Sequence, residues 1–177
     1  TVGRVLVIGG APGMCGAVYL SALAAYRCGA GIVEIFTHRK NYEALASRVP
    51  EAVYSLYDTE KEDTCTICSR LADQIKKADS IVLGCGLGKS DIAKAMVKTT
   101  LENSSCPLVI DADGLNIISE SAELQALVKA RANNTVLTPH PGEMCRLSGK
   151  SVTEILSNTV NFATEISKKF GATVLLK

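Results

Sequence analysis

The sequence predicts an α/β protein with a doubly wound, mostly parallel sheet flanked by helices. Short runs rich in β-branched residues alternate with longer segments of helical period along the 177 residues. Glycine-rich segments follow two of these runs, at the positions where a strand would turn into a helix. Neither a Gly/Ser/Pro linker nor an internal repeat interrupts the alternation. We therefore expect residues 1–177 to belong to a single domain.

Strands are predicted where short apolar runs are bounded by turn residues. These runs are, in chain order, Arg4–Ile8, Gly31–Phe36, Val53–Tyr57, Ser80–Leu83, Pro107–Asp111, Thr135–Thr138 and Ala172–Lys177. The last run is rich in apolar residues, and it predicts a buried strand.

Helices are predicted where apolar residues recur with helical period between capping signals. The segments are Ala17–Arg27, Asn41–Arg48, Cys65–Lys77, Ser90 or Asp91 to Leu101, Ser121–Arg131, a start at Glu143–Leu147, and Val152–Phe170. In the third segment Ile67, Leu71 and Ile75 share one face. Gly29 and Gly171 follow the first and last segments, as glycines do at helix ends.

Charge and hydropathy limit the classes of partner. The formal net charge is +1, which gives no electrostatic reason to expect nucleic acid or an anionic membrane. No apolar run approaches the roughly 18 residues of a membrane span. No signal peptide is visible either.

The seven cysteines are an odd number scattered through apolar and helical contexts. A secreted disulfide framework would use an even number in a smaller chain, so we expect a reducing, cytoplasmic location. Cys65 and Cys68 form a CxxC pair without a second pair at metal-ligand spacing, which favours structural thiols over metal or redox chemistry.

Four unusual clusters follow predicted strands, where an open parallel sheet binds its ligands. They are Gly9–Gly16, Gly84–Gly88, Asp111–Asn116 and Thr138–Glu143. Because the carboxyl ends of parallel strands share one edge, we expect these clusters to converge there.

The segment Gly84-Cys-Gly-Leu-Gly-Lys-Ser90 invites comparison with phosphate-binding loops. A P-loop needs a glycine where Leu83 stands, and the segment is not GxGxxG either, so both comparisons fail. Two interpretations remain open: a tight loop whose backbone amides meet a phosphate or ribose, and glycines needed only for a sharp turn. The loop Gly9–Gly16, stiffened by Pro12, has the same ambiguity.

The other two clusters carry polar side chains. Asp111 and Asp113 with Asn116 could order a hydrated Mg²⁺, hold ribose hydroxyls, or build an Asx turn at Asp113-Gly114. His140 lies between two prolines in a stiffened loop, which favours function over core filling. Glu143 could reach a metal-bound phosphate, or it could simply suit the dipole of a helix start.

Five segments together resemble a known family. They are Gly3-Arg-Val-Leu-Val-Ile-Gly-Gly10 with Gly16-Ala17, Gly29-Ala-Gly31, Gly84-x-Gly-Leu-Gly88, Asp111-Ala-Asp-Gly-Leu-Asn116 and Thr138-Pro-His-Pro-Gly-Glu143. In this order they resemble the ADP/ATP-dependent NAD(P)H-hydrate dehydratases, whose fold is ribokinase-like. The resemblance spans nearly the whole chain.

The resemblance implies a repair enzyme that acts on S-NADH or S-NADPH hydrate. ADP or ATP would phosphorylate the ring hydroxyl, with Mg²⁺ shielding the phosphate charge, and phosphate would then leave to restore NAD(P)H. The family often carries an NAD(P)H-hydrate epimerase domain, so fusion to or partnership with an epimerase is expected. We also expect a homo-oligomer.

The resemblance carries roles over by position. The implied roles are hydrate binding for Ala17, Gly88 and His140, lining of the same cleft for Asp113 and Asn116, metal and phosphate support for Glu143, and the start of the nucleotide-binding KGxxT stretch for Lys177. The family's catalytic aspartate lies in a Gly-Thr-Gly-Asp segment, which does not occur in these 177 residues. We therefore expect the domain to be incomplete at its C-terminus, with no catalytic residue here and no activity of this part alone.

Two other functions stay open at this point. One is a ribokinase-like kinase for a vitamin alcohol or a sugar, because phosphorylating a hydroxyl uses the same fold and metal. The other is a nucleotide-binding module that has no catalytic half.

Overall fold

The computed structural model describes residues 2–131 and 134–177, and within them one parallel sheet of seven strands. Its strand order is β3-β2-β1-β4-β5-β6-β7, and every neighbouring pair is parallel. The strands are β1 (Arg4–Ile8), β2 (Ile32–His38), β3 (Val53–Tyr57), β4 (Ser80–Leu83), β5 (Leu108–Ile110), β6 (Thr135–Leu137) and β7 (Thr173–Val174). The predicted doubly wound α/β class is confirmed.

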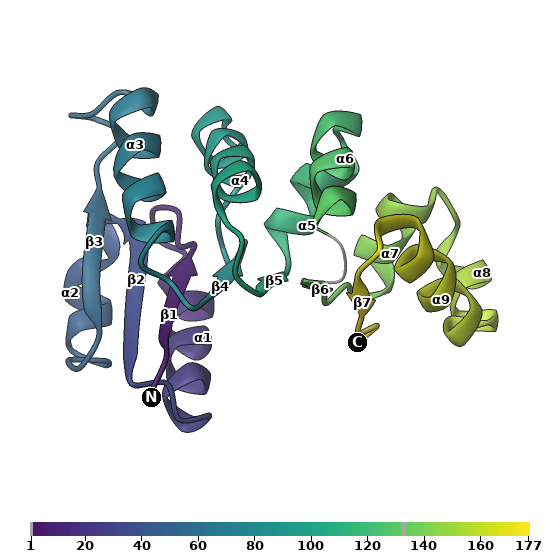
Figure 1. Ribbon diagram of the computed structural model, residues 1–177, viewed down its shortest axis with the longest axis horizontal. Coiled ribbons are helices and arrows are strands. Elements are labelled where there is room, and N and C mark those ends of the chain that lie inside the picture. Colours follow the sequence, from purple (N-terminus) through teal and green to yellow (C-terminus); the bar gives the residue numbers. More distant parts are fainter. Residues whose placement is uncertain (1, 132–133) are drawn as a thin grey trace.

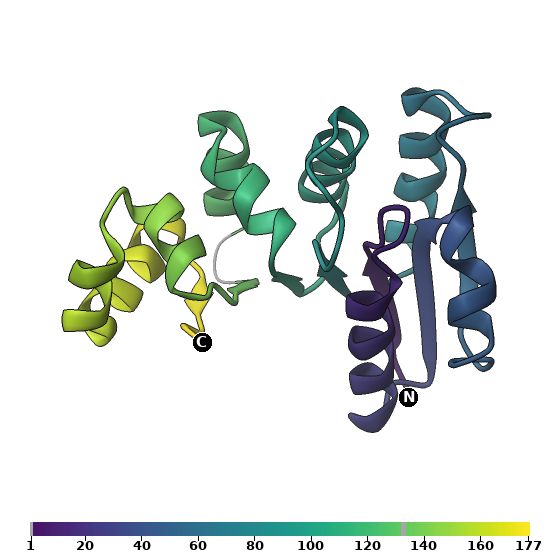
Figure 2. The same ribbon diagram turned by 180° about the vertical axis from the view of Figure 1, so that it is seen from behind.

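Helices cover the two faces of this sheet. They are α1 (Cys15–Arg27), α2 (Tyr42–Ala46) after the short 3-10 turn η1 (Arg39–Asn41), α3 (Thr64–Ile75), α4 (Asp91–Asn103), α5 (Asp113–Ser119), α6 (Ala122–Ala130), α7 (Pro141–Ser148), α8 (Val152–Ser157) and α9 (Thr159–Phe170). Helices α3, α4 and α6 line up along one face, and α1 and α2 lie on the other (Figure 1). Seen from behind, α1 and α2 are in front, and α7 to α9 extend beyond β6 and β7 (Figure 2).

Strand β1 shows how the sheet is buried on both faces. Leu6 and Ile8 belong to the apolar core under α3 and α4, whereas Val7 belongs to the second core under α1 and α2. Successive strand residues point to opposite faces, so a strand between two helix layers needs an uninterrupted apolar run. Each such side chain contributes about 1.5–3 kcal/mol through burial.

The order in which the strands are added to the sheet reverses direction at β1. Strands β1 to β3 proceed one way along the sheet, and β4 to β7 proceed the other way from the opposite side of β1. This arrangement makes the carboxyl ends of β1 and β4 the switch point, where loops diverge and leave a crevice for a ligand.

Three expectations about elements were wrong. Asp113-Gly114 does not form only a turn but begins α5, because Leu115, Ile117 and Ile118 are buried and hold the helix against the core. The predicted helix Val152–Phe170 is two helices, since Asn158 leaves helical geometry and its side chain accepts a hydrogen bond from the Asn161 amide to start α9.

The last strand also differs from its prediction. β7 covers only Thr173–Val174, at the edge of the sheet beside β6. Val174 is half-buried and Leu175 is 59% exposed. An edge strand pairs on one side, so its apolar residues do not imply the two-sided burial that the sequence suggested.

No helix in residues 2–131 and 134–177 is long and apolar enough to cross a membrane. All seven cysteines are free thiols. The CxxC pair, Cys65 and Cys68, lies on α3 as predicted.

Candidate functional site

The two glycine-rich loops meet at the switch point between β1 and β4. The Gly10 amide donates to the Cys85 carbonyl at 3.0 Å, and the Ala11 amide donates to the Gly86 carbonyl at 2.6 Å. Below them, the Gly84 amide donates to the Ile8 carbonyl at 3.0 Å. Backbone therefore packs directly against backbone at the centre of the candidate site.

Two glycines make this close packing possible. A Cβ at Gly9 would lie 2.2 Å from the Cys85 carbonyl oxygen, and one at Gly84 would lie 2.2 Å from the Asp111 carbonyl oxygen. Gly84 also has a φ of +110°, which L side chains rarely adopt. Packing between loops thus explains these glycines. Gly86 and Gly88 continue the second loop with φ of +59° and +75°.

Asn41 holds the first loop in place, a role that no sequence pattern indicated. Its side-chain amide nitrogen donates to the carbonyls of Gly10 at 2.7 Å and Ala11 at 3.1 Å. Its side-chain oxygen accepts from the Gly13 amide at 3.2 Å. The Thr37 hydroxyl adds a bond to the Gly10 carbonyl at 3.0 Å. Asn41 was predicted only as the start of a helix, because its contacts are about 30 residues away along the chain.

Gly88 and Asp113, both predicted site residues, are in direct contact. The Gly88 amide donates to Oδ2 of Asp113 at 2.8 Å. A tight turn aims this carboxylate, because the Gly114 amide donates to the Asp111 carbonyl at 3.0 Å. Ala112 within the turn has φ 49° and ψ −118°, which is strained for a residue with a Cβ and typical of the first central position of a type II′ turn.

Asp111, on the other side of Ala112, pairs with Lys177. The Lys177 ammonium lies 2.6 Å from Oδ1 of Asp111. The Lys177 amide donates to the Pro139 carbonyl at 3.0 Å, which ties the end of this segment to the loop before α7. Two predicted clusters, after β5 and β6, therefore meet at this lysine, which follows β7.

His140 and Glu143 form a capping box at the start of α7. Nδ1 of His140 accepts from the Gly142 amide at 3.0 Å, and the His140 amide donates to Oε2 of Glu143 at 2.9 Å. Nε2 of His140 lies 3.4 Å from Oε1 of Glu143. Glu143 is only 4% exposed, so capping alone accounts for its position, whereas the His140 side chain is 53% exposed and open to a ligand.

Asn116 contacts a cation that the sequence reasoning missed. Its side-chain oxygen accepts from Nη1 of Arg146 at 2.8 Å, which joins α5 to α7. Arg146 stands three residues after Glu143 on the same helix, and this spacing was the signal that could have identified it. The arrangement adds a positive side chain to the acidic and amide groups of the site.

Ala17 lies in the first turn of α1, beside the second glycine loop. A Cβ at Gly86 would lie 3.8 Å from the Ala17 Cβ, and one at Gly88 would lie 3.4 Å from the Ala11 Cβ. Ala17 is exposed. Among the predicted site residues, Gly88 and Asp113 thus contact each other across two segments, and Lys177 contacts the segments that contain Asp113 and His140 through Asp111 and Pro139.

The electrostatics argue against a thiol nucleophile here. Cys85 is buried, and this burial raises the pKa of its thiol, against a lowering by the hydrogen bond that the Ser21 hydroxyl donates at 3.2 Å. Burial also lowers the pKa of His38, which packs edge-on against Tyr57 behind the Asn41 segment. Both shifts favour the neutral form of the group.

Residues 2–131 and 134–177 contain no group of three His, Cys, Asp or Glu side chains placed to hold a metal.

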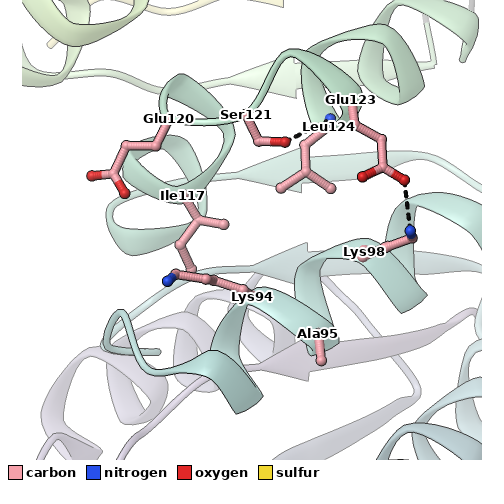
Figure 3. Close-up of a pocket in the computed structure, with 8 residues that line it drawn as sticks. All are labelled: Lys94, Ala95, Lys98, Ile117, Glu120, Ser121, Glu123 and Leu124. Atoms are coloured by element: carbon pink, nitrogen blue, oxygen red, sulfur yellow. Dashed lines mark hydrogen bonds and ion pairs between the residues drawn. The ribbon is translucent and has the colours of Figure 1, made fainter.

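Two hollows lie close to the sheet. An apolar hollow of about 550 Å³ reaches from α1 across β4 and β5 to Asp111, Thr138 and Lys177. A groove of about 350 Å³ between α4 and α6 contains none of the predicted site residues (Figure 3). In that groove Lys98 is neutralised by Glu123 at 2.6 Å, so we place the site at the sheet edge instead.

Fold and site together define an α/β protein with a candidate ligand site at the switch point of a parallel sheet. The family model described as NAD(P)H-hydrate dehydratase matches residues 5–177. The chain belongs to the NAD(P)H-hydrate dehydratase family.

Relatives and solved structures agree with this assignment. The chain is 36% identical over 181 residues to the ADP-dependent (S)-NAD(P)H-hydrate dehydratase of Neisseria meningitidis, covering 100% of this chain and 56% of that protein. It is 33% identical over 175 residues to the bifunctional NAD(P)H-hydrate repair enzyme Nnr of Escherichia coli, covering 99% of this chain and 31% of that protein. A ribokinase-like superfamily protein of Enterococcus faecalis superposes with a TM-score of 0.82 at 28% identity, covering 99% of this chain and 57% of that one.

A fourth comparison concerns a protein crystallised with nucleotide. The ADP/ATP-dependent NAD(P)H-hydrate dehydratase of Bacillus subtilis, co-crystallised with ATP and Mg²⁺, superposes with a TM-score of 0.76 at 26% identity. The match covers 99% of this chain and 57% of that one. The chain thus spans about a third of the bifunctional relative and little more than half of the others. The predicted ribokinase-like fold is confirmed.

Proposed function

We propose that the protein carrying this chain repairs S-NAD(P)H hydrate by a nucleotide-dependent dehydration. The observation that carries the proposal is the convergence of four of the five family segments at the carboxyl edge of the sheet, in a chain that matches the family over residues 5–177. The names of the Neisseria and Bacillus relatives give the substrate and the nucleotide for those proteins.

Ala17, Gly88 and His140 are the residues we assign to the hydrate. Ala17 at the start of α1 offers a small surface on which a flat ring can lie close to backbone. Asp113 fixes the Gly88 amide, and the exposed ring of His140 faces outward from a capped, rigid helix start. Asn116, held by Arg146, lines the same cleft. Rigid positioning of these groups favours a productive orientation of the bound ring.

The nucleotide and the metal belong beside Lys177 and Glu143. Lys177 offers an ammonium group near the edge, although Asp111 binds it in this structure. A carboxylate has about four lone-pair positions, so Glu143 keeps capacity for a cation while capping α7. Mg²⁺ suits one or two carboxylates together with phosphate oxygens, and bound there it would neutralise charge on the transferred phosphoryl group.

The chemistry requires two bond changes in sequence. The ring hydroxyl oxygen forms a bond to the terminal phosphorus of ADP or ATP while the bridging P–O bond breaks, which leaves AMP or ADP. The ring C–O bond then breaks, phosphate leaves with the electron pair, and the adjacent ring carbon loses a proton to restore the double bond. Phosphorylation replaces hydroxide, a poor leaving group, with phosphate. The residues that accept these protons are not assigned within the chain.

Product analysis tests the proposal. The protein is given S-NADPH hydrate with ADP or ATP and Mg²⁺, and the nicotinamide absorbance and free phosphate are followed together. We expect one phosphate for each NADPH regenerated. A stable phosphoester without NADPH would instead establish a small-molecule kinase, and no reaction with either nucleotide would contradict the proposal.

Three further parts of the proposal concern the setting of the protein. We propose that it works in the cytoplasm, as a homo-oligomer, and together with an NAD(P)H-hydrate epimerase. A fused epimerase is compatible with the share of the bifunctional Escherichia coli relative that the chain spans, 31%. Removal of R-hydrate from a mixed preparation by the protein alone would support fusion.

A further inference from the structure

Asn41 uses both ends of its side-chain amide on the first glycine loop. The nitrogen donates to the carbonyls of Gly10 and Ala11, and the oxygen accepts from the Gly13 amide. Asn41 is 2% exposed, as expected for a buried polar side chain whose groups are paired. The Asn41 side chain therefore supplies hydrogen-bond partners for the loop backbone, as a neighbouring strand would in a sheet.

Thr37, on β2, adds to this interaction, and we call the side chains of Asn41 and Thr37 together the latch. Its hydroxyl donates to the Gly10 carbonyl and accepts from the Asn41 side-chain nitrogen at 3.2 Å. A Cβ at Gly10 would lie 2.4 Å from the Thr37 hydroxyl oxygen and 3.0 Å from the Asn41 side-chain nitrogen. The backbone at Gly10 therefore packs closely against the side chains of Thr37 and Asn41.

The latched loop forms one side of the second loop. Its Gly10 and Ala11 amides bond to Cys85 and Gly86, and the Ala11 methyl lies next to the space over Gly88. The same loop leads directly into α1, where Ala17 lies beside Gly86. Movement of the loop would displace two of the segments that we assign to the hydrate, those of Ala17 and Gly88.

We propose that Asn41, assisted by Thr37, is a positioning residue that holds the Gly10–Gly13 loop in the shape required to bind the nicotinamide hydrate. The inference rests on the proposed function. It concerns hydrate affinity alone, because the nucleotide is assigned to Lys177 and Glu143 at the other segments of the edge.

The test measures KM for each substrate separately in the full protein. Asn41→Asp keeps the side-chain shape but turns a carboxylate oxygen toward the carbonyls of Gly10 and Ala11, which repels the loop. Asn41→Ala removes the latch outright, and Thr37→Val removes only its hydroxyl. Thr100→Val is the matched control, since Thr100 is equally buried and donates to the Met96 carbonyl inside α4.

We expect the two Asn41 variants to raise KM for the hydrate on the order of tenfold, with KM for the nucleotide unchanged. Thr37→Val should shift the hydrate KM in the same direction by less, and Thr100→Val should leave both KM values as they are. Folding of each variant is checked by circular dichroism. If Asn41→Ala does not fold, Asn41→Asp and Thr37→Val decide the matter.

An unchanged hydrate KM in folded Asn41→Asp and Thr37→Val proteins would overturn the inference. Equal rises in both KM values, or the same rise in Thr100→Val, would also overturn it, because either result reports a general loss of structure. A wild-type protein that does not process the hydrate would contradict the proposed function itself. This failure is distinguishable from failure of the inference, which is judged by comparing variants with an active wild type.

Discussion

Replacing Gly84 with alanine should damage the protein through a single added methyl group. The Cβ would lie 2.2 Å from the Asp111 carbonyl oxygen, 2.6 Å from the Gly114 nitrogen and 2.9 Å from the Gly114 Cα. All three atoms are backbone, so no flexible side chain can move aside. The substitution would push the loop after β4 away from the turn that aims Asp113.

Gly29→Ala provides the matched control. Gly29 has a φ of +92°, close to the +110° of Gly84, but a Cβ there would meet nothing within 4 Å. Alanine in this backbone region costs about 1–2 kcal/mol, offset in part by the smaller entropy of the unfolded chain. We expect a net loss of about 1 kcal/mol at Gly29. Overpacking against backbone adds about 1–3 kcal/mol or more at Gly84.

Thermal unfolding followed by circular dichroism measures the difference. A loss of 1 kcal/mol lowers Tm by about 2–4 °C in a protein of this size. Gly29→Ala should therefore lower Tm by that amount, and Gly84→Ala by about 6 °C or more. Equal decreases in the two variants would refute the reasoning, because they would show that the close approach of the two loops costs nothing.

Three other predictions concern single groups. Ala112→Gly relieves the positive φ of the turn and should stabilise the protein by about 1 kcal/mol in chemical denaturation; a loss of stability would contradict the strain. Asp113→Ala leaves the Gly88 amide without its acceptor and should raise the hydrate KM, with an unchanged KM as the contrary result. Burial raises the pKa of Tyr57 to about 12, so its stabilisation persists below pH 10 and is lost as the pH rises through 12. Tyr57→Phe should flatten this decline in the free energy of unfolding. If the free energies of the variant and the wild type declined in parallel with pH, the prediction would be wrong.

The sequence was sufficient for the layers of the fold because burial on two faces leaves a strong signal. The continuous apolar run Arg4–Ile8 and the face Ile67, Leu71 and Ile75 both lie where the patterns indicated. The signal failed where local chemistry was ambiguous. Aspartate and glycine start turns, but they also precede helices, so α5 was missed.

The break between α8 and α9 shows another limit. The stretch Val152–Phe170 keeps a helical period on both sides of Asn158, and periodicity alone does not detect a single residue that leaves the helix. The decisive interaction is local: the Asn158 side chain caps the helix that follows it.

The meeting of the four clusters at one edge was predictable because each cluster follows a strand. Their roles in holding one another were not, since the partners lie far apart in sequence: Gly88 with Asp113, and Asn116 with Arg146. The same reason hid the Asn41 latch. Long-range contacts of this kind arise from the strand order, which no local pattern contains.

The central claim is that the ring hydroxyl leaves as phosphate at the edge formed by these loops. It is tested most directly with S-NADPH hydrate whose ring hydroxyl carries a heavy-oxygen label, incubated with the protein, nucleotide and Mg²⁺. Mass spectrometry of the products then locates the label. The account predicts that the label appears in free phosphate as NADPH is restored. Label in water, or label retained in a stable phosphoester, would contradict it.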